Sequence, residues 1–170
     1  MKLLLPYSEK IIRHFKNPKN MGRIKNASAV GEAGNLVCGD IMKLYLKIGE
    51  NKKGEKMIKD IKFETFGCIV AIANTSMLTT MVKGKTLEEV SKIKKDDLIK
   101  KLGRPLPPIK IHCSVLALDA LHEAIYDYYL KNKLPIPEEL KMEHERIQKT
   151  LNTIEHRHEE LVGLEEKILK

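Results

Sequence analysis

Residues 41–66, IMKLYLKIGENKKGEKMIKDIKFETF, decide the fold of this chain. Apolar side chains alternate with lysines over residues 41–48, which predicts a strand with one buried face. Residues 49–54 carry two glycines and an asparagine, so they predict a turn, and residues 57–66 predict a second strand. The two strands form an antiparallel hairpin. The residues just before 41 and just after 66 are therefore expected at the same end of the sheet.

Two of the three cysteines flank this hairpin. Cys38 precedes the first strand and Cys68 follows the second, so the hairpin brings both thiols to one end of the sheet. The third cysteine, Cys113, follows His112. An odd number of cysteines argues against a disulfide framework and favours thiols that bind metal or carry out sulfur chemistry.

Helices are predicted for most of the remaining chain. Residues 69–82 are apolar and free of Gly and Pro, which predicts a buried helix beginning next to Cys68. A long helix is predicted from Cys113 to Leu130. Shorter helices are predicted over residues 6–15, from Thr86 onward, and over 96–102. Residues 31–34 are interpreted as a loosely structured or edge segment.

Pro135 and Pro137 separate a last segment from the rest, so we expect two parts: residues 1–134 and a charged helical extension over 135–170. The sequence of this extension predicts one helix that begins at residue 138. Its apolar residues recur every seven positions, at Leu140, Ile147, Ile154, Leu161 and Ile168. Such a stripe can dock on the domain or pair with a second copy. Polar residues between them favour a packed or partly exposed helix over a strong coiled coil.

Charge and hydropathy exclude some classes of function. The net charge is +8, but the C-terminal 34 residues carry more acidic than basic side chains. No nucleic-acid motif accompanies the positive charge, so we interpret it as a lysine-rich surface. No apolar run is long enough to span a bilayer, and the apolar start is too short for a signal peptide. A soluble cytoplasmic protein is the expectation, with no nucleic acid and no membrane as partner.

The predicted helix starts bear on the chemistry of two thiols. Cys68 and Cys113 both lie at helix N-termini, where unpaired N–H groups and the helix dipole stabilise a thiolate. Asp40 follows Cys38 by two residues, and Gly39 between them permits a tight turn. Three thiolates with one oxygen or nitrogen ligand suit Zn(II) or a [2Fe–2S] cluster. A carboxylate ligand is harder and weaker than a fourth thiolate, so a cluster held by it should be labile.

Ordinary structural roles remain open for single residues. Any one cysteine is compatible with a small buried hydrophobe, although all three, each beside Gly or His, are harder to explain in this way. Asp40 alone is compatible with a turn or cap, and His112 with a capping or surface residue. His14 and His122 are assigned structural roles. The remaining pair near the C-terminus, His156 and His158, lies in a solvated, charged helix.

The combined motifs resemble one known family. Cys-Gly-Asp at 38–40, Thr-Phe-Gly-Cys at 65–68 and His-Cys-Ser-Val-Leu-Ala at 112–117 look like those of the IscU/NifU N-terminal family of iron–sulfur cluster assembly scaffolds. The opening over residues 7–20 is similar too, and the resemblance runs from about residue 6 to residue 131. Ile69-Val70 replaces the family's usual Gly-Ser after the second cysteine, and Leu118 replaces a common acidic residue. These departures remove no ligand.

The resemblance implies an α+β fold, with a small antiparallel β-sheet of about three strands, helices packed on it and here a long C-terminal helix. It implies assembly of a labile [2Fe–2S] cluster from iron and sulfur, and its transfer to apo acceptor proteins. Cys38, Cys68 and Cys113 would be ligands, Asp40 the fourth ligand or a lability determinant, and His112 the alternative ligand. Zinc is the expected substitute occupant. The protein would be a carrier and not an enzyme.

The resemblance also implies partners. Cys113 would accept persulfide sulfur from a cysteine desulfurase, and a ferredoxin-type protein would supply electrons. The segment Leu106 to Lys110 is similar to the one that an Hsp70-type chaperone grips in bacterial members. A homo-oligomer is left open.

Two other functions compete with the scaffold. A zinc-dependent sulfurtransferase of the SufU type resembles it but carries an insertion between its second and third cysteines; here Cys113 follows Cys68 by 45 residues, with no sign of an insertion. A structural zinc domain that only mediates interactions usually pairs its cysteines as Cys-x2-Cys, and this chain has no such pair.

Overall fold

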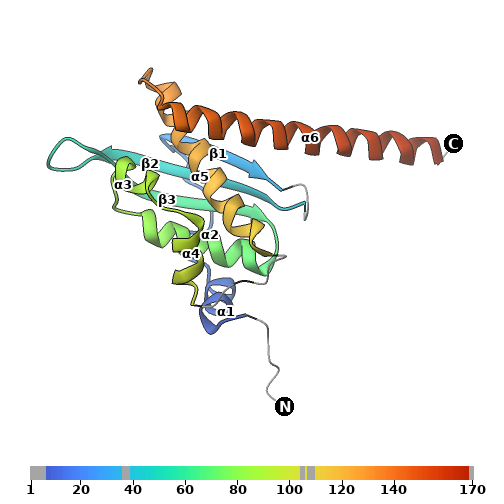
Figure 1. Ribbon diagram of the computed structural model, residues 1–170, viewed down its shortest axis with the longest axis horizontal. Coiled ribbons are helices and arrows are strands. Elements are labelled where there is room, and N and C mark those ends of the chain that lie inside the picture. Colours follow the sequence, from blue (N-terminus) through green and yellow to red (C-terminus); the bar gives the residue numbers. More distant parts are fainter. Residues whose placement is uncertain (1–6, 36–38, 104–105, 107–109, 169–170) are drawn as a thin grey trace, which may run out of the picture.

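The protein is described here from a computed structural model that covers residues 7–35, 39–103, 106 and 110–168, without the side chains of residue 158 and of residues 161–168. A three-stranded antiparallel sheet forms the centre, in the order β1-β2-β3 (Figure 1). Helices pack on this sheet, so the predicted α+β fold with about three strands is confirmed. Cys38 and residues 107–109, in the middle of the segment from Leu106 to Lys110, lie outside the described residues.

The predicted hairpin consists of β2 (Ile41–Glu50) and β3 (Lys56–Phe66), paired so that Ile41 lies opposite Phe66. Alternation holds as predicted: Met42, Leu44 and Leu46 are fully buried. A register shift between Lys47 and Ile48 interrupts the ladder near the turn. Residues before β2 and after β3 therefore lie at the same end of the sheet, as the sequence predicted.

The segment around residues 31–34 is a true edge strand. β1 (Ala29–Gly34) pairs antiparallel with β2, with Gly31 opposite Leu44. One backbone group on its outer edge has a hydrogen-bond partner, because the Val30 N–H donates to the Asp127 carboxylate on α5 (His112–Lys131) at 2.9 Å. Gly31 allows α5 to approach very closely, since a Cβ there would lie within 3.0 Å of the backbone of Ala120 and Ala124.

Two helices form a layer on the buried face of the sheet. These are α2 (Ile69–Val82), with the predicted bounds, and α5 (His112–Lys131), which contact each other and the strands. Phe63 of β3 and Leu116 and Leu121 of α5 are among the side chains buried in the core between the layers. None of the helices in the described part of the chain combines the length and apolar character needed to cross a membrane.

Three short helices complete the domain. α1 (Glu9–Lys16) begins three residues later than predicted, because the Ser8 hydroxyl accepts from the Ile11 N–H and caps the helix there. α3 (Leu87–Ser91) begins at the predicted Thr86 cap, which forms a capping box with Glu89. α4 (Lys95–Lys101) follows it.

The last helix, α6 (Glu138–Ile168), packs on α5 over its first turns and then runs past the end of the domain (Figure 1). Ile147, in the predicted apolar stripe, is 2% exposed. Gln148 and His144 on the same face both hydrogen bond to Glu123 of α5, at 2.8 and 2.9 Å. The predicted docking of the stripe on the domain is therefore observed for the first half of the helix.

Candidate metal centre

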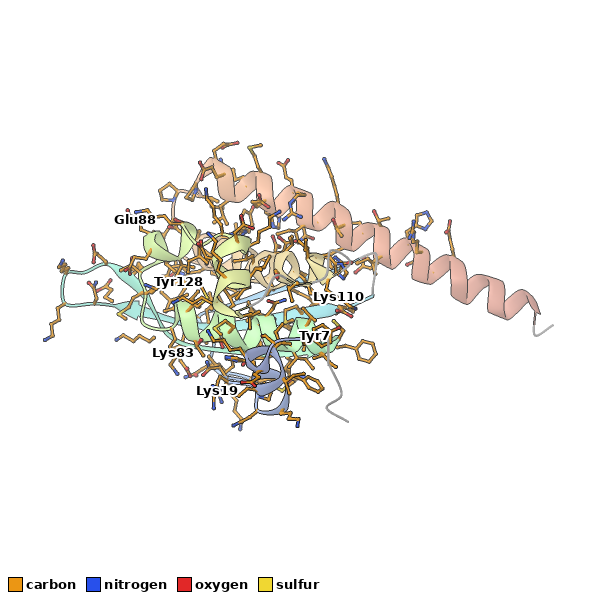
Figure 2. The ribbon with its side chains drawn as sticks, turned by 60° about the horizontal axis from the view of Figure 1, so that its bottom comes forward. Tyr7, Lys19, Lys83, Glu88, Lys110 and Tyr128 are labelled. Atoms are coloured by element: carbon orange, nitrogen blue, oxygen red, sulfur yellow. The ribbon has the colours of Figure 1, made fainter. Side chains whose placement is uncertain are left out.

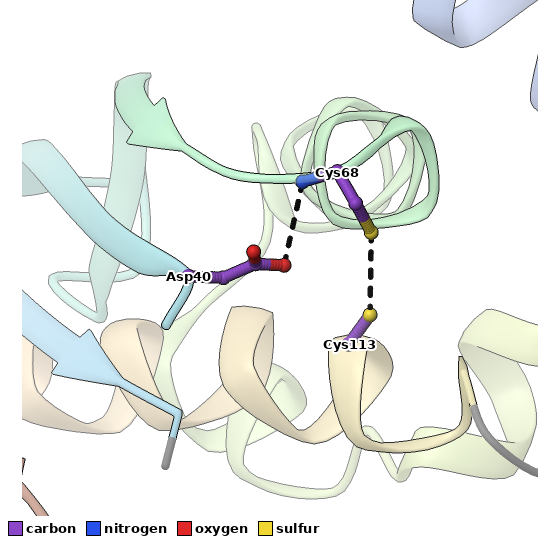
Figure 3. Close-up of side chains that lie close together, drawn as sticks. All are labelled: Asp40, Cys68 and Cys113. Carbon is purple, nitrogen blue, oxygen red and sulfur yellow. Dashed lines mark hydrogen bonds between the residues drawn. The ribbon is translucent and has the colours of Figure 1, made fainter. Parts of the chain in front are cut away.

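Three potential ligands meet at the end of the sheet where the hairpin begins and ends (Figure 3). One ligand atom each from Asp40, Cys68 and Cys113 lies within 4.8 Å of the other two. The Sγ atoms of Cys68 and Cys113 are 3.6 Å apart. This distance is far longer than the ~2.05 Å of a disulfide bond, so the two sulfurs are not bonded to each other. It is short enough for both sulfurs to bind one metal centre.

Backbone hydrogen bonds to Asn35 hold Asp40 at this point. The Asn35 N–H donates to the Asp40 carbonyl at 3.0 Å, and the Gly39 N–H donates to the Asn35 carbonyl at 2.9 Å. Gly39 has φ +70°, a left-handed conformation that favours glycine, as the sequence suggested. The Asp40 side chain is turned inward, and the residue is 6% exposed.

Close packing brings the carboxylate of Asp40 to the start of α2. The Cys68 N–H, the first free donor of that helix, donates to Asp40 Oδ2 at 3.4 Å. Gly67 packs closely at this point, since a Cβ there would lie 3.0 Å from the Thr65 hydroxyl and 3.1 Å from the Ala71 Cβ. The Phe-Gly-Cys sequence therefore has a packing reason for its glycine.

The surroundings of Cys68 favour ionisation of its thiol near neutral pH. The hydrogen bond from Cys113 and the backbone N–H groups of Val70 and Ala71 lower the pKa of the Cys68 thiol to about 6, against partial burial and the nearby Asp40 charge. Cys68 is the N-cap of α2, so its sulfur faces unpaired N–H groups of the first turn. The predicted thiolate character of Cys68 therefore has a structural cause.

Cys113 is the second residue of α5 and is fully buried. Its neighbour His112 begins the helix, but its ring is not part of the group formed by Asp40 and the two thiols. The His112 Nε2 is nevertheless buried without a hydrogen-bond partner among the described residues. Of the two candidates for a fourth ligand, the described residues bring Asp40 to the thiols and leave His112 with an unsatisfied nitrogen outside their group.

A lysine that the sequence assigned only to a chaperone segment interacts electrostatically with the thiols. The negative charges of Cys68, first, and then of Cys113 raise the pKa of Lys110. Tyr7 and Lys110 are labelled at this end of the molecule (Figure 2). The signal for Lys110 was present in the sequence, three residues before Cys113. Leu106, at the start of that segment, is buried in the core.

The arrangement can hold a thiophilic cation. Two thiols and a carboxylate converge, one thiol ionises readily, and Cys38 lies two residues before Asp40 in the sequence. Thiolates favour zinc and iron–sulfur clusters, and a carboxylate is compatible with zinc. Fold and site together define a small α+β domain with a cysteine-based candidate metal centre at one end of its sheet.

Comparison with known proteins places this domain in a family. Residues 6–135 match the model of the NifU-like N terminal domain. Iron-sulfur cluster assembly scaffold proteins IscU 1 and IscU 2 of Archaeoglobus fulgidus are each 51% identical to it over 140 residues, 82% of this chain and 88% of theirs. Escherichia coli (strain K12) IscU, a scaffold protein of the same description, is 45% identical over 132 residues, 76% of this chain and 98% of its own.

A solved structure agrees with these matches. FiSufU, from Fervidobacterium islandicum AW-1, superposes with a TM-score of 0.57 at 29% sequence identity, and the alignment covers 71% of this chain and 96% of that one. The chain therefore belongs to the NifU-like N-terminal family, as the resemblance of its cysteine motifs predicted.

Proposed function

We propose that this protein is a scaffold on which an iron–sulfur cluster is assembled and from which it is passed to apo acceptor proteins. The observation that carries the proposal is the meeting of Asp40, Cys68 and Cys113 at the end of the sheet. Family membership and the scaffold names of relatives that are 45–51% identical support it. The cargo would be a [2Fe–2S] cluster bound by Cys38, Cys68 and Cys113, with zinc as a substitute occupant.

We assign Asp40 as the fourth ligand, because its carboxylate is already within 4.8 Å of both sulfurs. A hard carboxylate holds iron of a sulfide cluster less firmly than a thiolate does, so the cluster can leave. His112, with its unsatisfied buried Nε2, is the alternative ligand during transfer. A labile cluster suits a protein that must transfer the cluster to an acceptor.

Sulfur would enter through Cys113. Its thiolate attacks the terminal sulfur of a persulfide on a cysteine desulfurase, an S–S bond forms to Cys113, and the desulfurase cysteine leaves as a thiolate. Each sulfane sulfur then takes up two electrons to become sulfide, which requires an electron donor of the ferredoxin type. The positive charge of Lys110 interacts with the charges of both thiols and would stabilise negative sulfur during this exchange. The protein itself acts as a carrier and not as an enzyme.

The remaining partners are proposed from the sequence. Leu106 to Lys110 is the segment we propose for an Hsp70-type chaperone. The two-part organisation, a scaffold domain over residues 1–134 and a helical extension over 135–170, also remains our proposal. Association into a homo-oligomer is left to measurement of mass in solution, with and without residues 137–170.

Anaerobic reconstitution tests the function. The apoprotein is incubated with Fe(II), cysteine and a desulfurase, and the visible spectrum and the iron, sulfide and zinc contents are measured. We expect cluster absorption bands that move to an apo-ferredoxin added later. A protein that binds zinc and forms no cluster under any condition would refute the scaffold and favour the zinc-dependent sulfurtransferase or a structural zinc domain.

A further inference from the structure

A second group of potential ligands lies at a cleft away from the cysteines. The cleft has a volume of about 720 Å³ and is lined by residues of α3, α5 and α6, by the start of α4 and by the segments that precede α4 and α6. Asp119 and His122 of α5 and Glu143 of α6 line it. Asp119 and His122 follow Cys113 by six and nine residues, which is about 9 and 13 Å along the helix axis.

These three side chains are positioned to share one ion. Asp119 and His122 are three residues apart and so lie on one face of α5, while Glu143 comes from the facing helix. One ligand atom from each lies within 4.8 Å of the other two. Ligands about 2.1 Å from a single ion are at most about 4.2 Å apart, so small side-chain rotations close the site.

His122 is available as a ligand. Its Nδ1 is buried without a hydrogen-bond partner among the described residues. Burial lowers the pKa of the His122 imidazole, so the ring is neutral near pH 7 and offers a lone pair. A buried ring nitrogen without a hydrogen-bond partner is costly in a structure unless something binds it.

Arg146 currently neutralises the two carboxylates. Its Nη2 donates to Asp119 Oδ1 at 2.5 Å and to Glu143 Oε2 at 2.7 Å. One guanidinium supplies a single positive charge to two carboxylates, and it leaves the imidazole without a partner. The Arg146 side chain is 47% exposed, so it can rotate into solvent and release the carboxylates of Asp119 and Glu143. A divalent cation would neutralise both carboxylates and also bind the imidazole.

We propose that Asp119, His122 and Glu143 form a second metal site, which takes a divalent first-row transition ion such as Zn(II) and contains no thiolate. One imidazole and two carboxylates are ligands that such borderline ions accept. Because Glu143 belongs to α6 and the other two ligands to α5, an ion bound there joins the C-terminal helix to the domain.

Metal titration of a full-length, cysteine-free variant tests the site. Cys38, Cys68 and Cys113 are each replaced by Ser, the protein is stripped of metal, and Zn(II) binding is measured by calorimetry. We expect one equivalent to bind. His122→Gln and Glu143→Gln in this background should each weaken binding more than about tenfold, since even indirect supports of a metal site cost 10- to 100-fold. His156→Gln, at an exposed histidine of α6, is the matched control and should change nothing.

Arg146→Gln separates a metal site from a purely structural salt bridge. If Arg146 competes with the ion, its removal tightens Zn(II) binding. Circular dichroism confirms that each variant is folded. Should the cysteine-free protein fail to fold, Co(II) added to the wild-type chain gives the same answer: the first equivalent shows thiolate-to-metal charge transfer, and the second, at this site, does not. Absence of saturable Zn(II) binding in the folded variant, or binding insensitive to His122→Gln, overturns the proposal.

Discussion

Replacing Cys113 by Ala should make Cys68 much harder to ionise. The Cys113 thiol, 3.6 Å from the Cys68 sulfur, is the largest cause of the low pKa of Cys68. Alanine removes that donor and leaves partial burial and the charge of Asp40, which both raise the pKa, opposed by the N–H groups at the start of α2. The pKa of Cys68 therefore rises from about 6 toward its ordinary value of 9.0.

The size of the effect follows from these two values. With a pKa of about 6, Cys68 is roughly 90% thiolate at pH 7; at 9.0 it would be about 1% thiolate. Thiolate nucleophilicity itself rises with pKa, which offsets part of this loss in a rate measured at one pH. The midpoint of the reaction against pH is therefore the sharper quantity, and it should move upward by more than one pH unit.

The assay is alkylation of the metal-free protein with iodoacetamide from pH 5 to pH 10, without oxygen. Peptide mass spectrometry reports Cys68 separately from the other cysteines. Cys38→Ser is the control, because it removes a cysteine and keeps the Cys68–Cys113 pair. A Cys68 midpoint that stays near pH 6 in Cys113→Ala, in a protein that circular dichroism shows to be folded, would refute the assignment of the low pKa to the paired thiols.

Three further predictions concern the fourth ligand, the sheet and the last helix. Asp40→Ala should give a longer-lived cluster that moves more slowly to an apo-ferredoxin, as followed by visible absorption, because the His112 nitrogen then replaces the weaker carboxylate oxygen as the fourth ligand. Gly31→Ala should lower the free energy of unfolding by about 3 kcal/mol or more in urea titrations, since its Cβ would overlap the backbone of α5. Ile147→Ala should cost about 2–3 kcal/mol, also in urea, because this 2%-exposed side chain anchors α6.

Each of these has a matched comparison. His112→Ala should alter cluster lifetime less than Asp40→Ala does, and the reverse order would make His112 the fourth ligand. Gly49→Ala should be mild, because the new methyl meets only the flexible end of Lys59; equal costs for the two glycines would contradict the close-packing argument. Met142→Ala, at a residue that is 65% exposed on α6, should change stability by less than about 0.5 kcal/mol.

Local sequence patterns were enough to predict much of the fold. The hairpin over residues 41–66 and the helix over 69–82 appear with nearly the predicted bounds, because alternation and uninterrupted apolar runs are strong signals. The first helix began later than predicted. The sequence predicts a start at Pro6, whereas the hydroxyl of Ser8 caps the helix, and a side-chain cap outweighs the weaker signal of a nearby proline.

The close approach of α5 to the sheet could not be predicted. Residues 31–34 read as an irregular or edge segment because two glycines lie among four residues. In the fold, Gly31 is where α5 lies directly against β1, so the glycine serves packing rather than flexibility. Nothing local to residue 31 indicates that Ala120 and Ala124, about ninety residues later, are its neighbours.

By itself, the sequence determined that Cys38 and Cys68 flank one hairpin, that Cys68 and Cys113 begin helices, and that their motifs belong to one family. Only the tertiary structure decided that Asp40 joins the two helix-borne thiols while His112 stands outside their group. It also decided that Glu143 of the last helix meets Asp119 and His122. The physical reason is that local sequence determines which helix or strand carries a residue. The neighbours of its side chain depend on how the helices and the sheet pack, which brings together residues far apart in the sequence.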